Sequence, residues 1–179
     1  IEYLYDALGN KKRQIEYRLE GLKIKMTTTD FIGNFVYIDG KPAWNTFDEG
    51  RVVYTSAGTC FAENYIKDHL GNVRVAFGND GSSSLIRQVN AYYPFGMTIS
   101  SLSGEPSNLS ASENEYQYNG KMFQDELGLN WYDYGARFYD PVVGRWWSVD
   151  PHAENYYSWS PYHYAANNPI RVTDPTGMD

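Results

Sequence analysis

The sequence predicts an all-β protein built from antiparallel hairpins. Aromatic residues make up 17% of the chain, with 17 tyrosines and 5 tryptophans, and these residues favour pleated, half-buried strand surfaces. The 16 glycines and 8 prolines supply frequent turns. Helical periodicity is weak throughout, and we expect only one short helix, over residues 158–166, opened by a serine or by Pro161.

Strands are expected where short runs alternate apolar and polar side chains, because successive residues of a strand face opposite sides of a sheet. Dipeptides such as Asp39-Gly40 stand between the runs, and Gly, Asn and Asp tolerate the positive φ that hairpin turns demand. The expected strands cover residues 14–19, 34–38, 51–54, 64–67 and 72–77.

A weak internal repeat supports the hairpin prediction. The pattern Asp-x-Leu-Gly begins at Asp6, Asp68 and Asp125. In each copy the aspartate side chain can bond the backbone of a tight turn, and the glycine supplies the unusual φ. Hairpins repeated in this way predict an extended sheet. A small, polar linker is expected over residues 100–112.

Charge and composition exclude several classes of function. The formal net charge is −7, which argues against a nucleic-acid or anionic-membrane surface. No apolar run approaches the ~20 residues of a membrane helix, and the first residues do not resemble a signal peptide. The chain does not begin with Met, so we expect it to be a piece of a longer protein whose export signal could lie upstream. The lone Cys60 is expected to be a small buried hydrophobe.

Three Asp-Pro dipeptides near the end of the chain supply carboxylates that could share a proton and tight turns that could present a peptide bond, although from the residues alone a structural role is the commoner one. They begin at Asp140, Asp150 and Asp174, and Arg137 lies just before the first. Peptide hydrolysis by two carboxylates needs one of them ionised and the other protonated, and carboxylates held close together favour that division. A nearby arginine holds a carboxylate ionised. Asp-Pro also commonly starts turns, and Arg137 could bridge strands, so a structural role stays open.

Other sites find less support in the sequence. His69, His152 and His163 lack metal-ligand spacing, so we expect no metal, and the absence of a phosphate-binding glycine loop predicts no cofactor. Aromatic residues could instead stack sugars in a groove, although such residues more often pack a sheet. They are Trp131, Tyr132, Trp146, Trp147, Tyr156, Tyr157 and Trp159.

The second half of the chain resembles the repeat-associated core of rearrangement hot spot (Rhs) proteins, also called YD-repeat proteins. The resemblance predicts degenerate YD-repeat hairpins over residues 1–90 and the core over residues 91–179. It is carried by Tyr-Tyr-Pro-Phe-Gly-Met at 92–97, Tyr-Asn-Gly-Lys at 118–121, Asp-Glu-Leu-Gly-Leu at 125–129, Tyr-Asp-Tyr-Gly-Ala-Arg-Phe-Tyr-Asp-Pro at 132–141, Gly-Arg-Trp at 144–146, Asn-Asn-Pro-Ile at 167–170 and Asp-Pro-Thr-Gly-Met at 174–178.

The resemblance implies part of a curled β-shell that encloses a C-terminal toxin, with the core as a plug at one end. In many members the core cuts its own chain once, by an aspartic-protease-like mechanism, after an Asp-Pro-x-Gly-Leu motif. Motif matching places the two aspartates at Asp150 and Asp174, and the arginine at Arg137. The scissile bond would join Met178 to Asp179, with Met in place of the usual Leu.

The partners implied are the chain's own toxin segment, the rest of the shell and a secretion apparatus, with export from a bacterial cytoplasm to target cells. Two alternatives remain open at this point. One is a non-catalytic structural or interaction module, in which the Asp-Pro turns only fold the chain. The other is a carbohydrate-binding or glycoside-cleaving β domain that uses the aromatic residues. Whether the chain is an enzyme, and which aspartate would be the acid, are likewise left open.

Overall fold

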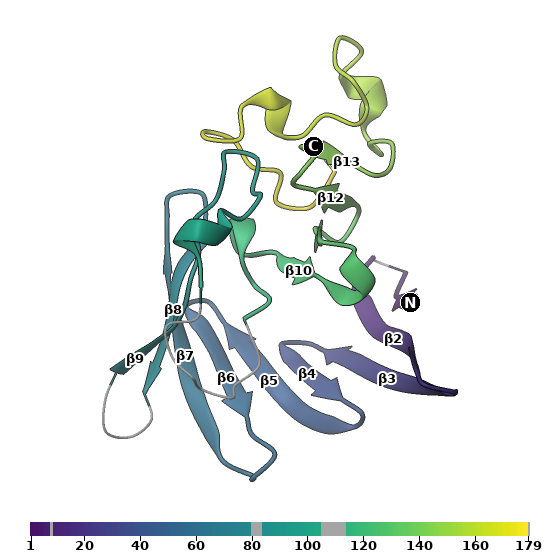
Figure 1. Ribbon diagram of the computed structural model, residues 1–179. Coiled ribbons are helices and arrows are strands. Elements are labelled where there is room, and N and C mark those ends of the chain that lie inside the picture. The colour runs from purple at the N-terminus through teal and green to yellow at the C-terminus, as the bar shows by residue number, and fades with distance from the viewer. Residues whose placement is uncertain (8, 80–83, 105–113, 179) are drawn as a thin grey trace. The chain divides into compact units, whose positions relative to one another are not determined.

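The computed structural model describes residues 1–7, 9–79, 84–104 and 114–178. Within these ranges the regular elements are β-strands and short 3₁₀ turns, arranged in two antiparallel sheets (Figure 1). The all-β prediction is therefore confirmed. Most of the expected linker and Asp179 lie outside the described residues.

The first sheet has nine strands, and their order in the sheet follows their order in the chain. All five strands expected from the sequence are confirmed within β2, β4, β6, β7 and β8, except that the first expected residues of two of them, Asn34 and Asn72, lie just outside the strands. The strands are β1 (Glu2–Tyr5), β2 (Lys11–Glu20), β3 (Lys23–Ile32), β4 (Phe35–Ile38), β5 (Lys41–Phe47), β6 (Gly50–Tyr54), β7 (Cys60–Lys67), β8 (Val73–Asn79) and β9 (Ser84–Val89).

All three copies of the Asp-x-Leu-Gly repeat form turns with the same backbone bond. The glycine amide donates to the aspartate carbonyl at 3.0 Å in the copies at Asp6 and Asp68, and at 2.9 Å in the copy at Asp125. The three glycines have positive φ. In the first two copies the carboxylate also accepts a turn amide, from Asn10 at 2.9 Å and from Asn72 at 3.1 Å, so the inferred physical basis is confirmed for these two.

The second sheet is smaller and carries four strands in the order β10-β11-β12-β13. The described part of the chain from residue 100 onward also contains short 3₁₀ turns. The strands are β10 (Met122–Gln124), β11 (Trp131–Asp133), β12 (Phe138–Asp140) and β13 (Arg145–Trp146), and the turns are η1 (Ser100–Leu102), η2 (Tyr118–Gly120), η3 (Glu126–Gly128), η4 (Ala153–Asn155) and η5 (Ala165–Asn167).

Two expectations from the sequence are wrong. No α-helix forms over residues 158–166, where the chain makes turns. The residues of η5, which overlaps the end of that segment, have positive φ, and this conformation cannot continue a right-handed helix. Cys60 is exposed rather than buried, because it opens β7 directly after the turn closed by Thr55 and Thr59.

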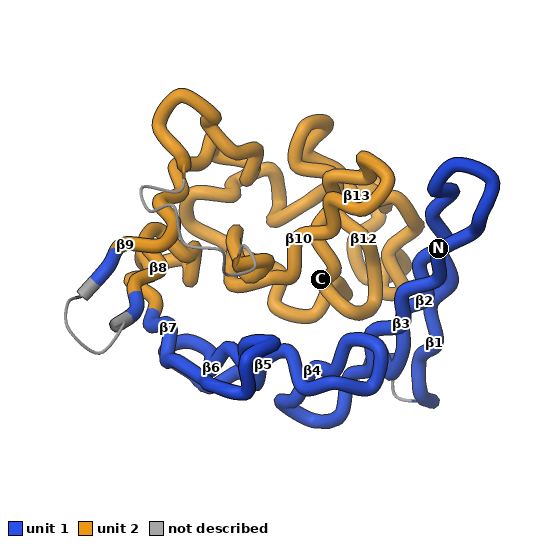
Figure 2. The backbone as a smooth tube through the Cα atoms, turned by 60° about the horizontal axis from the view of Figure 1, so that its bottom comes forward, with its two compact units in different colours: residues 1–64, 78–85 blue, residues 65–77, 86–179 orange. Residues whose placement is uncertain are grey.

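The chain divides into two compact units, one of residues 1–64 and 78–85, the other of residues 65–77 and 86–179 (Figure 2). The first unit buries an ion pair between Arg51 and Glu63, with the Arg51 Nε and Glu63 Oε1 atoms 2.9 Å apart. The Arg51 guanidinium lies 5.5 Å from the centre of the Trp44 ring. The second unit contains all the predicted site residues that the structure describes.

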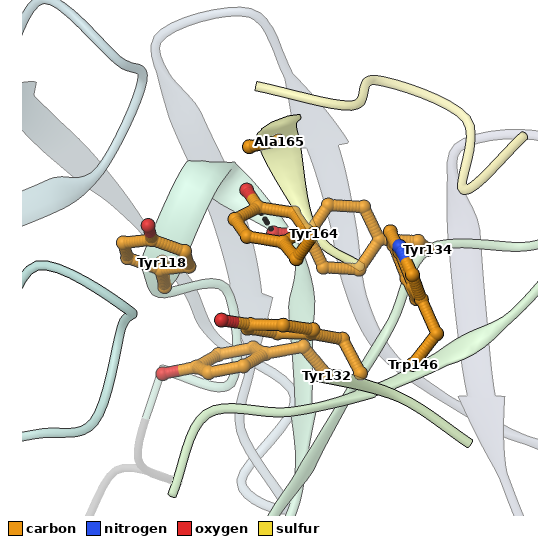
Figure 3. Packing of buried hydrophobic residues seen from close by; sticks show 7 residues of the cluster. Tyr118, Tyr132, Tyr134, Trp146, Tyr164 and Ala165 are labelled. Atoms are coloured by element: carbon orange, nitrogen blue, oxygen red, sulfur yellow. Dashed lines mark hydrogen bonds between the residues drawn. The ribbon is translucent and has the colours of Figure 1, made fainter. Parts of the chain in front are cut away.

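A cluster of tyrosines forms the core of the second unit (Figure 3). Most of their rings pack at tilted or edge-to-face angles, as aromatic quadrupoles prefer, and the rings of Tyr118 and Tyr139 are stacked. Three hydroxyls donate to successive carbonyls of one turn: Tyr118 to Pro94 at 2.9 Å, Tyr139 to Phe95 at 2.8 Å and Tyr132 to Gly96 at 3.3 Å. The cluster consists of Tyr118, Tyr132, Tyr134, Tyr139, Tyr164, Trp146 and Ala165.

This core predicts unfolding at alkaline pH. Burial raises the pKa of Tyr118 to about 12, and it also raises the pKa values of Tyr132, Tyr139 and Tyr164. Unfolded tyrosines ionise near pH 10, so above that pH the unfolded state releases protons that the folded state keeps. We expect stability to fall by about 1.4 kcal/mol per pH unit for each such tyrosine between pH ~10 and 12.

Tyrosinate absorbance and circular dichroism would check this expectation. Exposed tyrosines such as Tyr157, which is 91% exposed, should ionise with an ordinary midpoint while the chain is still folded. The buried tyrosines should ionise only together with the loss of dichroism. Ionisation of all the tyrosines at the ordinary midpoint, while the folded dichroism persists, would contradict the buried core.

Candidate active site

Arg137 lies at the centre of the predicted site. It immediately precedes β12, and only 2% of its surface is exposed. Its Nη2 atom lies 3.0 Å from the Asp150 Oδ2 atom and 3.2 Å from the Asp174 Oδ2 atom. Its Nε atom donates to the carbonyl of Gly177 at 2.5 Å. The guanidinium also lies 4.2 Å from the centre of the Trp146 ring. The structure thus brings together the three residues that motif matching singled out.

Asp150 is held by the turn that it begins. Its Oδ1 atom accepts the His152 amide at 2.8 Å, and its own amide donates to the Pro161 carbonyl at 3.0 Å. These two bonds leave Oδ2 directed at Arg137. Asp150 is 3% exposed, and its Oδ2 atom has no hydrogen-bond partner within the described part of the chain beyond this ion pair.

Asp174 organises the loop that carries the Asp-Pro-Thr-Gly-Met motif. Its Oδ1 atom accepts three backbone amides, from Thr176 at 3.1 Å, Gly177 at 2.7 Å and Met178 at 3.2 Å. The side chain is 1% exposed. Because the Met178 amide is bonded to this carboxylate, the last described residue of the motif lies beside Asp174.

Gly177 allows the loop to close on the site. Its φ is +76°, a conformation that side chains rarely adopt. A Cβ at this position would lie 3.1 Å from the Tyr134 Cβ atom and 3.2 Å from the Arg137 amide nitrogen. Glycine is therefore required both by the backbone conformation and by the close packing.

The third Asp-Pro dipeptide has different surroundings. The Asp140 Oδ1 atom accepts the amides of Val142 and Val143 at 2.8 and 3.1 Å, in a turn on the surface. Asp140 therefore provides an internal comparison: it is an Asp-Pro turn starter whose carboxylate accepts amides of its own turn.

Two residues of the Tyr-Asn-Gly-Lys motif have roles that reasoning from the sequence missed: Asn119 bonds the tyrosine core, and Lys121 contacts the cleavage motif. The Asn119 side-chain oxygen accepts the hydroxyls of Tyr134 and Tyr164, at 2.7 and 2.5 Å. The Lys121 Nζ atom donates to the Pro175 carbonyl at 2.6 Å. The motif itself could have drawn attention to these residues, since the asparagine and the lysine follow a core tyrosine. No spacing rule, however, linked Lys121 to a loop 54 residues later in the chain.

The remaining candidate features of the sequence lie elsewhere. Tyr132 and Trp146 belong to the buried core, whereas Trp147 is 54% exposed and packs on Trp131 with ring centres 4.8 Å apart. Among the residues that the structure describes, no group of His, Cys, Asp and Glu could hold a metal ion. No helix in the same ranges is long and apolar enough to cross a membrane.

Comparison with known proteins gives relatives over most of the chain. No protein-family model matches it. Salivary gland surface protein 1 of Aedes aegypti is 31% identical over 176 residues, which is 98% of this chain and 4% of that protein. The toxin subunit YenC2 of Yersinia entomophaga is 38% identical over 94 residues, 52% of this chain and 9% of that subunit. The tRNA3(Ser)-specific nuclease WapA of Bacillus spizizenii is 35% identical over 184 residues, covering 90% of this chain and 7% of the nuclease.

Solved structures share the fold. The crystal structure of TcdB2-TccC3-TEV matches 98% of this chain with a TM-score of 0.79 at 22% identity, over 9% of its own chain. The TcdB2-TccC3 structure matches the same share with a TM-score of 0.77. The chain thus spans less than a tenth of the length of each of these proteins. It is homologous to Rhs/YD-repeat-containing toxin proteins over a fragment of their repeat region.

Proposed function

We propose that the chain is part of an Rhs/YD-repeat shell of an exported toxin, with YD-repeat hairpins over residues 1–90 and the repeat-associated core over residues 91–179. The similarity to toxin subunits and to the TcdB2-TccC3 fold supports this proposal. The partners would be the rest of the shell, a toxin segment that follows the core, and a secretion apparatus.

We further propose that the core cuts its own chain once, between Met178 and Asp179. One carboxylate of the pair Asp150 and Asp174 takes a proton from water, which attacks the Met178 carbonyl carbon. The other carboxylic acid donates a proton as the C–N bond breaks. The products are a carboxylate on Met178 and an ammonium group on Asp179, which together take up both protons and the oxygen of one water, so the reaction needs no other reactant.

One observation carries this proposal: two nearly fully buried carboxylates share a single guanidinium nitrogen beside the cleavage motif. Hydrolysis by two carboxylates needs one of them to act as a base and the other as an acid. The pair Asp150 and Asp174, both beside Arg137, supplies the residue types for that division.

The tethered loop adds proximity. The carboxylate of Asp174 already binds the Met178 amide at 3.2 Å, so the substrate does not have to be captured from solution. Effective concentrations in such intramolecular reactions can be very high. The site therefore needs no wide cleft and would act once per chain.

The test is the intact mass of a chain that continues some tens of residues past Asp179. We expect the parent to split after Met178, and both Asp150→Asn and Asp174→Asn to stay whole, because each change removes one of the two proton carriers. Asn keeps the Oδ1 acceptor of each turn, so folding should survive, as near-ultraviolet circular dichroism would show.

Asp140→Asn is the matched control, since it changes an Asp-Pro turn whose carboxylate accepts the amides of Val142 and Val143 in a surface turn. It should be cut like the parent. If the parent and all variants stay whole while folded, the core is a structural plug. This structural plug is the second candidate function. It is favoured by the bonds that the Asp150 and Asp174 carboxylates accept from the amides of their own turns.

A further inference from the structure

Lys121 lies outside the proposed catalytic group but contacts the cleavage motif. It sits between η2 and β10, and its backbone is fixed on both sides: its amide donates to the Tyr118 carbonyl, and its carbonyl accepts the Gln117 amide, both at 3.0 Å. From this fixed position its Nζ atom reaches the Pro175 carbonyl at 2.6 Å. The ammonium also lies 5.1 Å from the centre of the Tyr134 ring.

The contact completes a pattern along the loop. Three successive carbonyls of the motif are each bound by a donor from another segment: Pro175 by Lys121 Nζ, Thr176 by the Ala136 amide at 3.3 Å, and Gly177 by Arg137 Nε. Donors from other segments thus bind the carbonyls of three consecutive residues of the loop. The Asp174 carboxylate, which belongs to the loop itself, accepts the amides of Thr176, Gly177 and Met178. Lys121 holds the end of the loop that is farthest from the Arg137 bond.

The positive charge of Lys121 also interacts with the carboxylate of Asp174. Burial lowers its pKa, and the carboxylates of Asp174 and Asp133 act in the opposite direction. A partly desolvated cation near Asp174 strengthens a bond to a carbonyl and attracts the neighbouring carboxylate.

We propose that Lys121 is a positioning residue for self-cleavage: it holds the Pro175 carbonyl, and through it the loop that presents Met178 to Asp150 and Asp174. This inference rests on the proposed autoproteolysis. Lys121 touches neither the scissile bond nor water in this role, and a displacement of about 1 Å in a reacting group can slow a reaction about 100-fold.

Two measurements test the inference. The first follows the single-turnover cleavage rate of the extended chain for the parent, Lys121→Met and Lys121→Arg. We expect Lys121→Met to be cut about 10 to 100 times more slowly, and Lys121→Arg to recover most of the rate because it keeps a cationic donor. Lys67→Met is the matched control: Lys67 also lies over a tyrosine ring, that of Tyr65, at 5.8 Å, and this change should leave the rate unaltered.

The second measurement is hydrogen exchange at the amides of Gly177 and Met178, made in the uncut Asp150→Asn chain. Adding Lys121→Met should speed this exchange, and adding Lys121→Arg or Lys67→Met should not. Parent-like cleavage and exchange in Lys121→Met would overturn the inference, as would equal slowing in Lys121→Met and Lys121→Arg. If the parent itself is not cut, the proposed cleavage fails, and the exchange rates still decide whether Lys121 holds the loop.

Discussion

Replacing Arg137 by methionine is expected to lower the free energy of unfolding by about 3–5 kcal/mol and to abolish cleavage, because it leaves buried charges without their partner. Arg137 balances Asp150 and Asp174 and donates to the Gly177 carbonyl. All three side chains are at most 3% exposed, so water cannot replace the lost contacts without opening the site. Methionine keeps an apolar stem against Trp146, which confines the loss to charge and hydrogen bonds. Urea denaturation followed by tryptophan fluorescence would measure the change.

Two comparisons isolate the cause. Arg145→Met removes an arginine with an exposed side chain, and its effect should stay within about 0.5 kcal/mol. Combining Arg137→Met with Asp150→Asn and Asp174→Asn removes the unbalanced charges as well, so the triple variant should be more stable than Arg137→Met alone. A triple variant that loses the sum of the separate effects would show that Arg137 acts through packing rather than through charge.

Replacing Gly177 by alanine is expected to displace the cleavage loop and to slow cleavage by about 100-fold or more. The φ of +76° costs an L residue about 1–2 kcal/mol. In addition, the new methyl group would press on the Tyr134 Cβ atom and the Arg137 amide nitrogen. Either the loop or Arg137 must then move, and both hold the proposed catalytic group. The measurement is the cleavage rate of the extended chain, together with its thermal unfolding.

Gly128→Ala is the matched control for this change. Gly128 has the same φ of +76°, and a Cβ there would meet nothing within 4 Å. It should therefore lose only the conformational part of the stability and should leave cleavage intact. Equal effects of the two substitutions on the cleavage rate would mean that close packing at Gly177 does not position the site.

The fold was largely predictable because its strands are short, alternate in polarity and end at Gly, Asn or Asp turns. In the first sheet, the strands β1, β3, β5 and β9 were not among the runs singled out. In β3 the central threonines give no apolar alternation, and the strand pairs with β2 and β4. The helix expected over residues 158–166 failed for a related reason. That segment is rich in aromatic and small residues, and its packing into turns overrides a weak local preference.

The candidate site shows where sequence reasoning stops. Motif matching identified the three site residues, but their spacing along the chain could not give the distances between their side chains. Only the fold reveals that Arg137 lies between Asp150 and Asp174 and that Asp140 does not share this environment. The part played by Lys121 depends on a contact across 54 residues, which no local pattern could signal. Whether these residues act in catalysis remains a prediction.

The most direct test of the account is a time course of intact mass for the extended parent chain at several protein concentrations. Self-cleavage predicts two products whose masses locate the break between Met178 and Asp179, formed at a rate independent of concentration because the substrate is tethered. A folded chain that keeps its full mass, a break at another bond, or a rate that rises with concentration would contradict the account.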